Sequence, residues 1–504
     1  WQRSEDGATL TLTLKSDLAW SDGTPITAYD VFFSYLVTHD DDVQSRFASV
    51  LNAEVTAAAP LDAQTITFRF SSATCDALTV VNIPIIPAHA YEGDFAERAA
   101  AVFDDTNDVV AAYTTWQATY PDLSYRYVGS VTESLQPSIT YGDFAPDPGY
   151  VVDAGALRLT ASIDTVQTDA FQVLAIGDSN TVVDNFINGD LNFLAQPPVN
   201  RRADLRAVPG VQFYQLPGAQ FDYLGFNTAD PDPRHVRGYD DPEGQGHHPI
   251  FGDPRVVQAL RLAIDVDALI QVAVQGDGTR VAVNQAPTSW AYDATLPLSP
   301  YDPDEARRQL EAAGWRAVAG SSTRRCVDCL YGTEGDPLRF SLLVDESSGR
   351  QAINATLIEQ QLGAIGIEVQ TRSVSNTVEL NDELRLQRFD AFLTTYDGGY
   401  PYAPDVSAWF TQSEDVPELG ANVTSYVNPD LEALLTEART LPGCSRQARS
   451  ALYQQAAQAL SEDVPYIWLY APDEVYVASG NVRGFAPYPS AALWNITAWS
   501  VTGR

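Results

Sequence analysis

Three stretches in the second half of the chain are each preceded by an Asp or Asn that is followed directly by proline. The Asp or Asn side chain can accept a hydrogen bond from the start of a helix, and proline has the φ angle of a first helical position. The pairs are Asp253-Pro254, Asp302-Pro303 and Asn428-Pro429, which predict helices over 255–264, 304–313 and 431–439. Apolar stretches around them predict strands at 340–344, 367–370, 391–395 and 475–477. Helices that alternate with strands predict an α/β protein with mixed or parallel sheets.

The first seventy residues predict a similar mixture. Residues 9–14 alternate Thr with Leu, as a half-buried strand does, and residues 65–70 repeat the alternation. Between them, Thr27 and Asp30 have the spacing of a helix capping box. A chain of 504 residues is too long for one hydrophobic core, so two or three domains are expected.

The charge balance excludes some classes of partner. Sixty-six acidic residues against 30 basic ones give a formal net charge of −36. Such a surface repels phosphate backbones and anionic membranes, so nucleic acid is not an expected partner. No run of residues approaches the roughly 20 apolar positions that a membrane-spanning helix needs.

Four cysteines, Cys75, Cys326, Cys329 and Cys444, permit disulfides and favour an oxidising compartment. The Cys326–Cys329 pair lacks the second pair or nearby histidine that a zinc site needs, and its surroundings read as a loop rather than a redox-active strand–helix junction. We therefore expect a small loop-closing disulfide there. The pairing of Cys75 and Cys444 stays open.

Two patterns suggest other chemistry. Gly177-Asp178-Ser179 after an apolar run matches the nucleophile motif of lipase-like serine esterases, and His235 would be its base. Only about fifty residues separate the two, however, so Ser179 is kept as a remote alternative. His247 and His248 lie near two aspartates, but in a Gly- and Pro-rich loop that would not hold metal ligands rigidly, so no metal site is expected.

Several fragments, in order along the chain, resemble the extracellular solute-binding proteins of bacterial ABC importers, in the family 5 class that binds peptides and nickel. They run from Trp20-Ser21-Asp22-Gly23-Thr24-Pro25 and Pro84-Ile85-Ile86-Pro87 through Tyr223-Leu224-Gly225-Phe226-Asn227, Pro287-Thr288-Ser289-Trp290 and Tyr301-Asp302-Pro303 to Glu462-Asp463-Val464-Pro465. Each fragment is weak alone, but their number and order cover nearly the whole chain.

The resemblance implies a two-lobed α/β fold, the Venus-flytrap arrangement of periplasmic binding proteins, that closes on a ligand. Residues 1–155 would form an extra subdomain of lobe one, 156–255 lobe one, 256–475 lobe two, and 476–504 a return to lobe one. It further implies a monomer without cofactor or catalysis that delivers its ligand to the transmembrane permease subunits. The implied location is extracytoplasmic, with a lipid anchor in a segment preceding Trp1.

The segment after the predicted strand 391–395 is the main candidate for ligand binding. Peptide-binding members of the family carry an aspartate here that pairs with the ligand's amino terminus; that position falls on Tyr400 or, with one inserted residue, on Gly399. The nearest acidic residues are Asp397 and Asp405, and the aromatic residues of the segment are Tyr396, Tyr402 and Trp409. Aromatic surfaces and a carboxylate suit a small-molecule pocket, although the same rings could be ordinary packing.

Three residues elsewhere are further candidates. Asn227 could offer its amide to a ligand or tie the crossover between lobes, and Trp290 could line the site or belong to the core. Arg350 lies where some dipeptide-binding members place an arginine for the peptide carboxylate. The expected ligand is an oligopeptide or dipeptide, and the alternative is an oligosaccharide or another hydroxylated solute.

Overall fold

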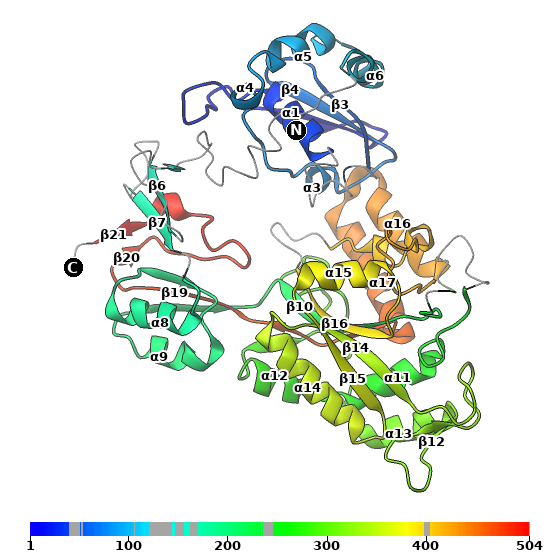
Figure 1. Ribbon diagram of the computed structural model, residues 1–504. Helices are drawn as coiled ribbons and strands as arrows, with labels where there is room; N and C mark the ends of the chain where they lie inside the picture. Colours follow the sequence, from blue (N-terminus) through cyan, green and yellow to red (C-terminus); the bar gives the residue numbers. More distant parts are fainter. Residues whose placement is uncertain are drawn as a thin grey trace.

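The fold is given by a computed structural model that describes residues 1–39, 51, 54–104, 106–120, 144–146, 156–161, 170–174, 176–232, 234, 245–397 and 404–502. Figure 1 shows an N-terminal group of elements, a larger α/β group, and a smaller group that includes the C-terminal strands. Within the described ranges, no helix has the length and apolar character needed to cross a membrane.

The N-terminal group is an antiparallel sheet covered by helices. Its strands, in the order β1-β2-β4-β3, are β1 (Gln2–Arg3), β2 (Thr9–Thr13), β4 (Thr65–Phe70) and β3 (Val55–Pro60), and its helices are α1 (Ala28–Thr38), α3 (Ala77–Val80), α4 (Ala88–Tyr91), α5 (Phe95–Phe103) and α6 (Val109–Thr119). Helix α1 begins as predicted, with Asp30 accepting a hydrogen bond from the Thr27 backbone at 2.8 Å. The core is aromatic: the Phe32 ring meets Phe103 at 4.8 Å and Trp116 at 5.3 Å.

The larger group is built on a five-stranded mixed sheet in the order β15-β14-β16-β10-β17. These strands are β15 (Glu368–Val374), β14 (Arg339–Asp345), β16 (Ala391–Asp397), β10 (Gln220–Phe226) and β17 (Tyr466–Trp468). Strand β14 runs parallel to β15 and β16, whereas β10 is antiparallel to β16 and β17. Two separate two-stranded sheets belong to the same group. One pairs β11 (Gly278–Arg280) with β18 (Tyr470–Pro472), and the other pairs β12 (Trp315–Arg316) with β13 (Arg325–Cys326).

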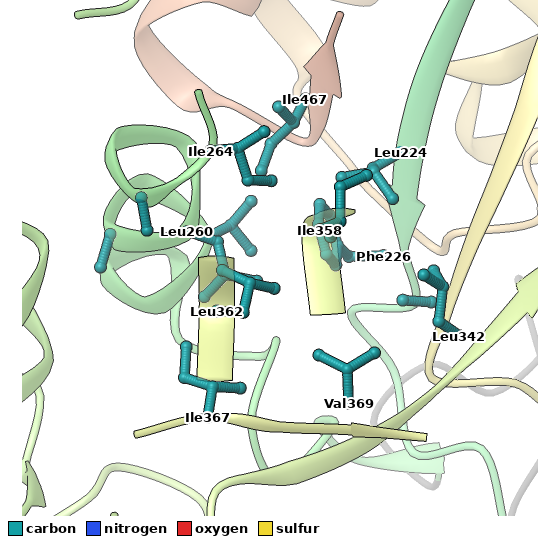
Figure 2. Close-up of a cluster of buried hydrophobic side chains, with 14 of the residues drawn as sticks. Leu224, Phe226, Leu260, Ile264, Leu342, Ile358, Leu362, Ile367, Val369 and Ile467 are labelled. Carbon is teal, nitrogen blue, oxygen red and sulfur yellow. The ribbon is translucent and has the colours of Figure 1, made fainter. Parts of the chain in front are cut away.

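Helices cover both faces of this sheet. They are α11 (Pro254–Ala263), α12 (Val266–Ala273), α13 (Pro303–Ala312) and α14 (Gly349–Gly363) on one face, and α15 (Thr377–Arg385), α16 (Pro429–Thr440) and α17 (Arg446–Asp463) on the other. Figure 2 shows the first of these cores, in which Leu260, Leu362 and Ile467 converge from different elements. The three Asx-Pro helices begin as predicted, since Asp253, Asp302 and Asn428 each accept a hydrogen bond from the first turn.

The smaller group contains the sheet β8-β19-β9, formed by β8 (Phe193–Ala195), β19 (Glu474–Ala478) and β9 (Gln212–Leu216), with helices α8 (Ser179–Asn188) and α9 (Arg202–Arg206). Two further sheets are β5 (Phe144–Pro146), β6 (Ala156–Ala161) and β7 (Ala170–Leu174), and β20 (Val482–Arg483) with β21 (Ser500–Val501). The chain passes between this group and the larger one at residues 217–219 and again at Asp473.

One of the expected domain boundaries does not coincide with the limits of the sheets. Residues 156–255 were expected in lobe one, yet β10 pairs along its full length with β16 in the larger sheet. The reason is that β10 is apolar on both sides: Phe221 and Tyr223 enter one core, while Leu224 and Phe226 enter the other. Only a sheet covered on both faces buries such a strand.

The N-terminal group is joined to helices α16 and α17 of the larger group. A disulfide links Cys75 to Cys444, and a second, within the loop at Cys326–Cys329, matches the prediction for that pair. Arg439 binds Glu54 at 2.9 Å beside the first disulfide. Burial raises the pKa of Glu54, although the charge of Arg439 opposes that shift.

Candidate functional site

The carboxyl ends of three parallel strands meet at one edge of the five-stranded sheet. Strand β14 ends at Asp345, β15 at Val374 and β16 at Asp397. Helix α14 connects β14 to β15 over one face, and α15 returns to β16 over the opposite face, so the strand order reverses at β14. Open α/β sheets hold their ligands outside the carboxyl ends of the strands at such a reversal.

A buried ion pair lies at this edge. Asp222, on β10, is completely buried, and Arg350, in the first turn of α14, binds it with two nitrogens. Nε donates to Oδ2 at 2.9 Å and Nη2 donates to Oδ1 at 3.0 Å, which is the forked geometry of a strong guanidinium–carboxylate pair. About a quarter of the Arg350 side chain is exposed, so the pair reaches the surface at the sheet edge.

Other polar groups complete the environment of Asp222. Gln351 and Thr395 donate to Oδ1 at 2.9 and 2.7 Å, and Asn354 donates to Oδ2 at 3.1 Å. The hydroxyl of Tyr470 lies 3.1 Å from the Asn354 amide nitrogen, and burial raises the pKa of Tyr470. Burial would lower the pKa of Arg350, but the charge of Asp222, its hydrogen bonds and the charge of Tyr470 together outweigh burial, and the net shift is upward.

A group of packed aromatic rings begins near the end of β16, at Tyr396. Tyr396 meets Trp409 edge-on at 5.3 Å, and Trp409 stacks on Tyr223 at 5.3 Å. Burial raises the pKa of Tyr396, with smaller contributions from Asp405 and Asp397. The structure therefore brings Tyr396 and Trp409 together, and both rings also pack against the core of the α15–α17 face.

The remaining residues of the predicted segment are placed as follows. Asp397 is exposed at the last position of β16, opposite Gln220. Asp405 is half-buried and accepts a hydrogen bond from the Ser407 backbone at 3.0 Å. Gly399, Tyr400 and Tyr402 lie outside the described residues.

Two other candidates make contacts within the protein. Asn227 is completely buried beyond the end of β10, at the opposite edge of the sheet, where β16 begins. Its amide donates to the Gln387 backbone and accepts from the Ala229 backbone, so both functions of the amide are used within the protein. Trp290 packs against Tyr453, and the guanidinium of Arg449 lies 5.3 Å from its ring centre.

The structure also locates the serine of the esterase-like motif and the two histidines considered as metal ligands. Ser179 is exposed as the first residue of α8, whose start is capped by the Asp178 side chain, and His235 lies outside the described residues. His248 binds Asp390 at 3.1 Å and His247 stacks on Tyr331. Among the residues that the structure describes, no cluster of His, Cys, Asp and Glu could hold a metal ion.

Sequence reasoning missed Asp222 and most of its partners. The signal was present, because Asp222 places a charge in the otherwise apolar strand Phe221–Phe226. A buried aspartate needs a cation and hydrogen-bond donors. The sequence could not show that Arg350, 128 residues away, supplies them.

The fold and the position of this edge define a class, the two-lobed periplasmic solute-binding proteins. The structure of the oligopeptide-binding protein AppA from Bacillus subtilis in complex with a nonapeptide matches all of this chain and 89% of that one, with a TM-score of 0.73 at 21% identity. NikA from Brucella suis in complex with Fe(III)-EDTA has the same TM-score at 18% identity, covering 100% and 90% of the two chains.

The sequence comparisons agree. The family model of the bacterial extracellular solute-binding proteins, family 5 Middle, matches residues 1–418, and the chain belongs to this family. The oligopeptide-binding protein AppA of Bacillus subtilis is 25% identical over 338 residues, 66% of this chain and 56% of AppA. Protein XP55 of Streptomyces lividans is 25% identical over 489 residues, 95% of this chain and 76% of XP55. The match to AppA thus spans little more than half of that protein.

Proposed function

We propose that this protein captures a small solute, with a peptide as the first candidate, and delivers it to the transmembrane subunits of an ABC importer. The observation that carries the proposal is the partly exposed side chain of Arg350, which Asp222 and Thr395 hold at the carboxyl edge of the sheet. The next residue of β16, Tyr396, belongs to an aromatic cluster on the other face of the same sheet. A fixed donor and aromatic surfaces at one sheet edge are typical of a ligand-binding site. The relatives named for oligopeptide binding support the choice of a peptide.

The proposal includes no catalytic step. It places the protein outside the cytoplasm as a lipid-anchored monomer. The two disulfides support an oxidising location, because such bonds persist mainly in extracytoplasmic proteins. Ser179 supplies a direct check: stoichiometric labelling by an active-serine probe would contradict this part of the proposal.

A hydroxylated solute such as an oligosaccharide is the second candidate. It is favoured by the aromatic pair Tyr396 and Trp409, since flat rings pack well against sugar faces, and by the exposed Asp397, which can accept from hydroxyl groups. Mass spectrometry of ligand co-purified from the native host identifies the solute directly. A thermal-shift panel of peptides and oligosaccharides ranks the two candidates, and stabilisation by sugars without stabilisation by peptides rejects the first.

Asp397 provides a test for recognition of the ligand's positive charge. We expect Asp397→Asn to weaken a peptide with a free amino terminus about tenfold while leaving its N-acetylated form within about twofold, because only the first loses a charge pair. Asp382→Asn, an exposed change on α15, is the matched control and should alter neither. Equal losses for both peptides would show that Asp397 does not pair with the ligand's charge.

A further inference from the structure

The two oxygens of Asp222 receive five hydrogen bonds. Oδ1 accepts from Arg350, Gln351 and Thr395, and Oδ2 accepts from Arg350 and Asn354. A carboxylate that only accepts hydrogen bonds, inside a core and beside a guanidinium, is in its ionised form. The charges of Asp222 and Arg350 therefore cancel at the sheet edge.

The same contacts use up the face of Arg350 that would hold a carboxylate. The single Nε hydrogen goes to Asp222, and the two hydrogens on Nη2 go to Asp222 and to Thr395 at 3.1 Å. Within the described part of the chain, Nη1 has no hydrogen-bond partner, so its two hydrogens are what the partly exposed side chain offers. A single nitrogen cannot form the two-pronged pair with which arginine binds carboxylates most strongly.

The surrounding charges are also unfavourable for an anion. Asp345 ends β14, Glu346 follows it, and Asp397 ends β16, so acidic groups flank Arg350 along this edge. The formal charge of the whole chain, −36, has the same sign. An incoming carboxylate would be repelled by these groups without meeting an uncompensated positive charge.

We propose that Asp222 is a specificity-determining residue that neutralises Arg350, so that this edge receives an uncharged oxygen of the ligand, such as a peptide carbonyl or a hydroxyl, and not a carboxylate. The inference rests on the proposed function, since it assigns the ligand chemistry of the same edge. Asp222 acts through Arg350 and does not touch the ligand. The expectation from the family resemblance, that Arg350 holds a peptide's carboxylate, is thereby replaced by a neutral acceptor.

The experiment compares two probes by isothermal titration calorimetry: N-acetyl-trialanine with a free carboxyl terminus and the same peptide as its amide. We expect the wild-type protein to bind the amide about three- to tenfold more tightly. Asp222→Asn keeps the shape of the side chain but leaves the charge of Arg350 uncompensated. It should raise the affinity ratio of acid to amide at least tenfold, and Asp222→Asn/Arg350→Gln should return that ratio to within about threefold of the wild-type value.

A purely structural role for Asp222 would weaken both peptides equally and leave their ratio unchanged, which would overturn the inference. Tighter binding of the free acid by the wild-type protein would overturn it as well, and this measurement needs no variant. If Asp222→Asn does not fold, the charge-neutral double variant is compared directly with the wild-type protein. An acid-to-amide affinity ratio more than tenfold below the wild-type value would show that the native pair favours a carboxylate.

Inorganic sulfate separates failure of the inference from failure of the peptide proposal. Sulfate should bind Asp222→Asn and neither the wild-type protein nor the double variant, because only the single variant carries an uncompensated guanidinium. If the wild-type protein binds neither of these peptides nor any peptide with a free amino terminus in the thermal-shift panel, the peptide proposal fails, and the sulfate titration still decides the role of Asp222. Equal sulfate binding by all three proteins would overturn that role.

Discussion

The disulfide between Cys75 and Cys444 should contribute far more to stability than the one between Cys326 and Cys329. The first pair is separated by 369 residues and the second by 3. A crosslink stabilises a protein mainly by restricting its unfolded chain, and the restriction grows with the logarithm of the loop length. The loop-closure relation gives ~6 kcal/mol for the long loop and ~2 kcal/mol for the short one at 25 °C.

The larger value is an upper limit, because it applies to unfolding of the whole chain. If the N-terminal group separates from helices α16 and α17 before the rest unfolds, part of the effect appears as loss of that junction. The junction also has non-covalent contacts, among them Arg439 with Glu54, which remain in a variant without the disulfide. We therefore expect the N-terminal group to stay docked at moderate temperature and to be the first part to detach on heating.

The assay uses the variants Cys75→Ser/Cys444→Ser and Cys326→Ser/Cys329→Ser, unfolded by heat in a calorimeter and by guanidinium with tryptophan fluorescence. The long-loop variant should lose two to three times as much free energy of unfolding as the short-loop variant, and limited proteolysis should release its N-terminal group first. Equal losses, or a greater loss for the short-loop variant, would refute the loop-closure reasoning.

Three other outcomes are expected. Leu362→Ala should cost ~2–5 kcal/mol in thermal unfolding, because Leu362 is 1% exposed in the core of Figure 2, whereas the control Leu419→Ala, at 82% exposure, should cost almost nothing. Asp277→Ala should destabilise by ~3 kcal/mol in guanidinium titration, because it removes the carboxylate that now lies 2.7 Å from the buried Arg202 of the smaller group and leaves that charge uncompensated. An unchanged midpoint would show that this contact between the smaller and larger groups is absent in solution. Burial raises the pKa of Asp415 above 3.8, so the folded state takes up the proton at a higher pH than the unfolded chain does. The free energy of unfolding, relative to that of Asp415→Asn, should therefore increase as the pH falls through the folded pKa of Asp415 and become constant below 3.8. Calorimetry from pH 7 to pH 3 measures this trend. A decrease over the same range would show that the folded state favours the carboxylate form.

Local patterns predicted the elements well. The helices after Asp253, Asp302 and Asn428 begin where the capping pairs place them, because a cap depends only on residues within one turn. Strands β14 and β16 extend one or two residues beyond their predicted ends, since sheet pairing continues past the apolar stretch.

The candidate site could be predicted only in part. The end of β16 was recognised, and Tyr396 and Trp409 do meet there, because both lie in one segment of the chain. The amide of Asn227 was expected either at the ligand or at the crossover, and the structure shows it bound to backbone groups. Its position at the opposite edge follows from the antiparallel direction of β10, which composition does not reveal.

The sequence by itself determined where helices and strands begin, the acidic character of the surface and the family to which the chain belongs. These properties depend on residues close together in the chain or on its overall composition. The tertiary structure alone decided that β10 joins the larger sheet, that Cys75 meets Cys444, and that Asp222 lies against Arg350. The first and third depend on strand order and register, and the second on how the N-terminal group packs against helices α16 and α17. All three bring together groups more than a hundred residues apart, and so no local pattern contains them.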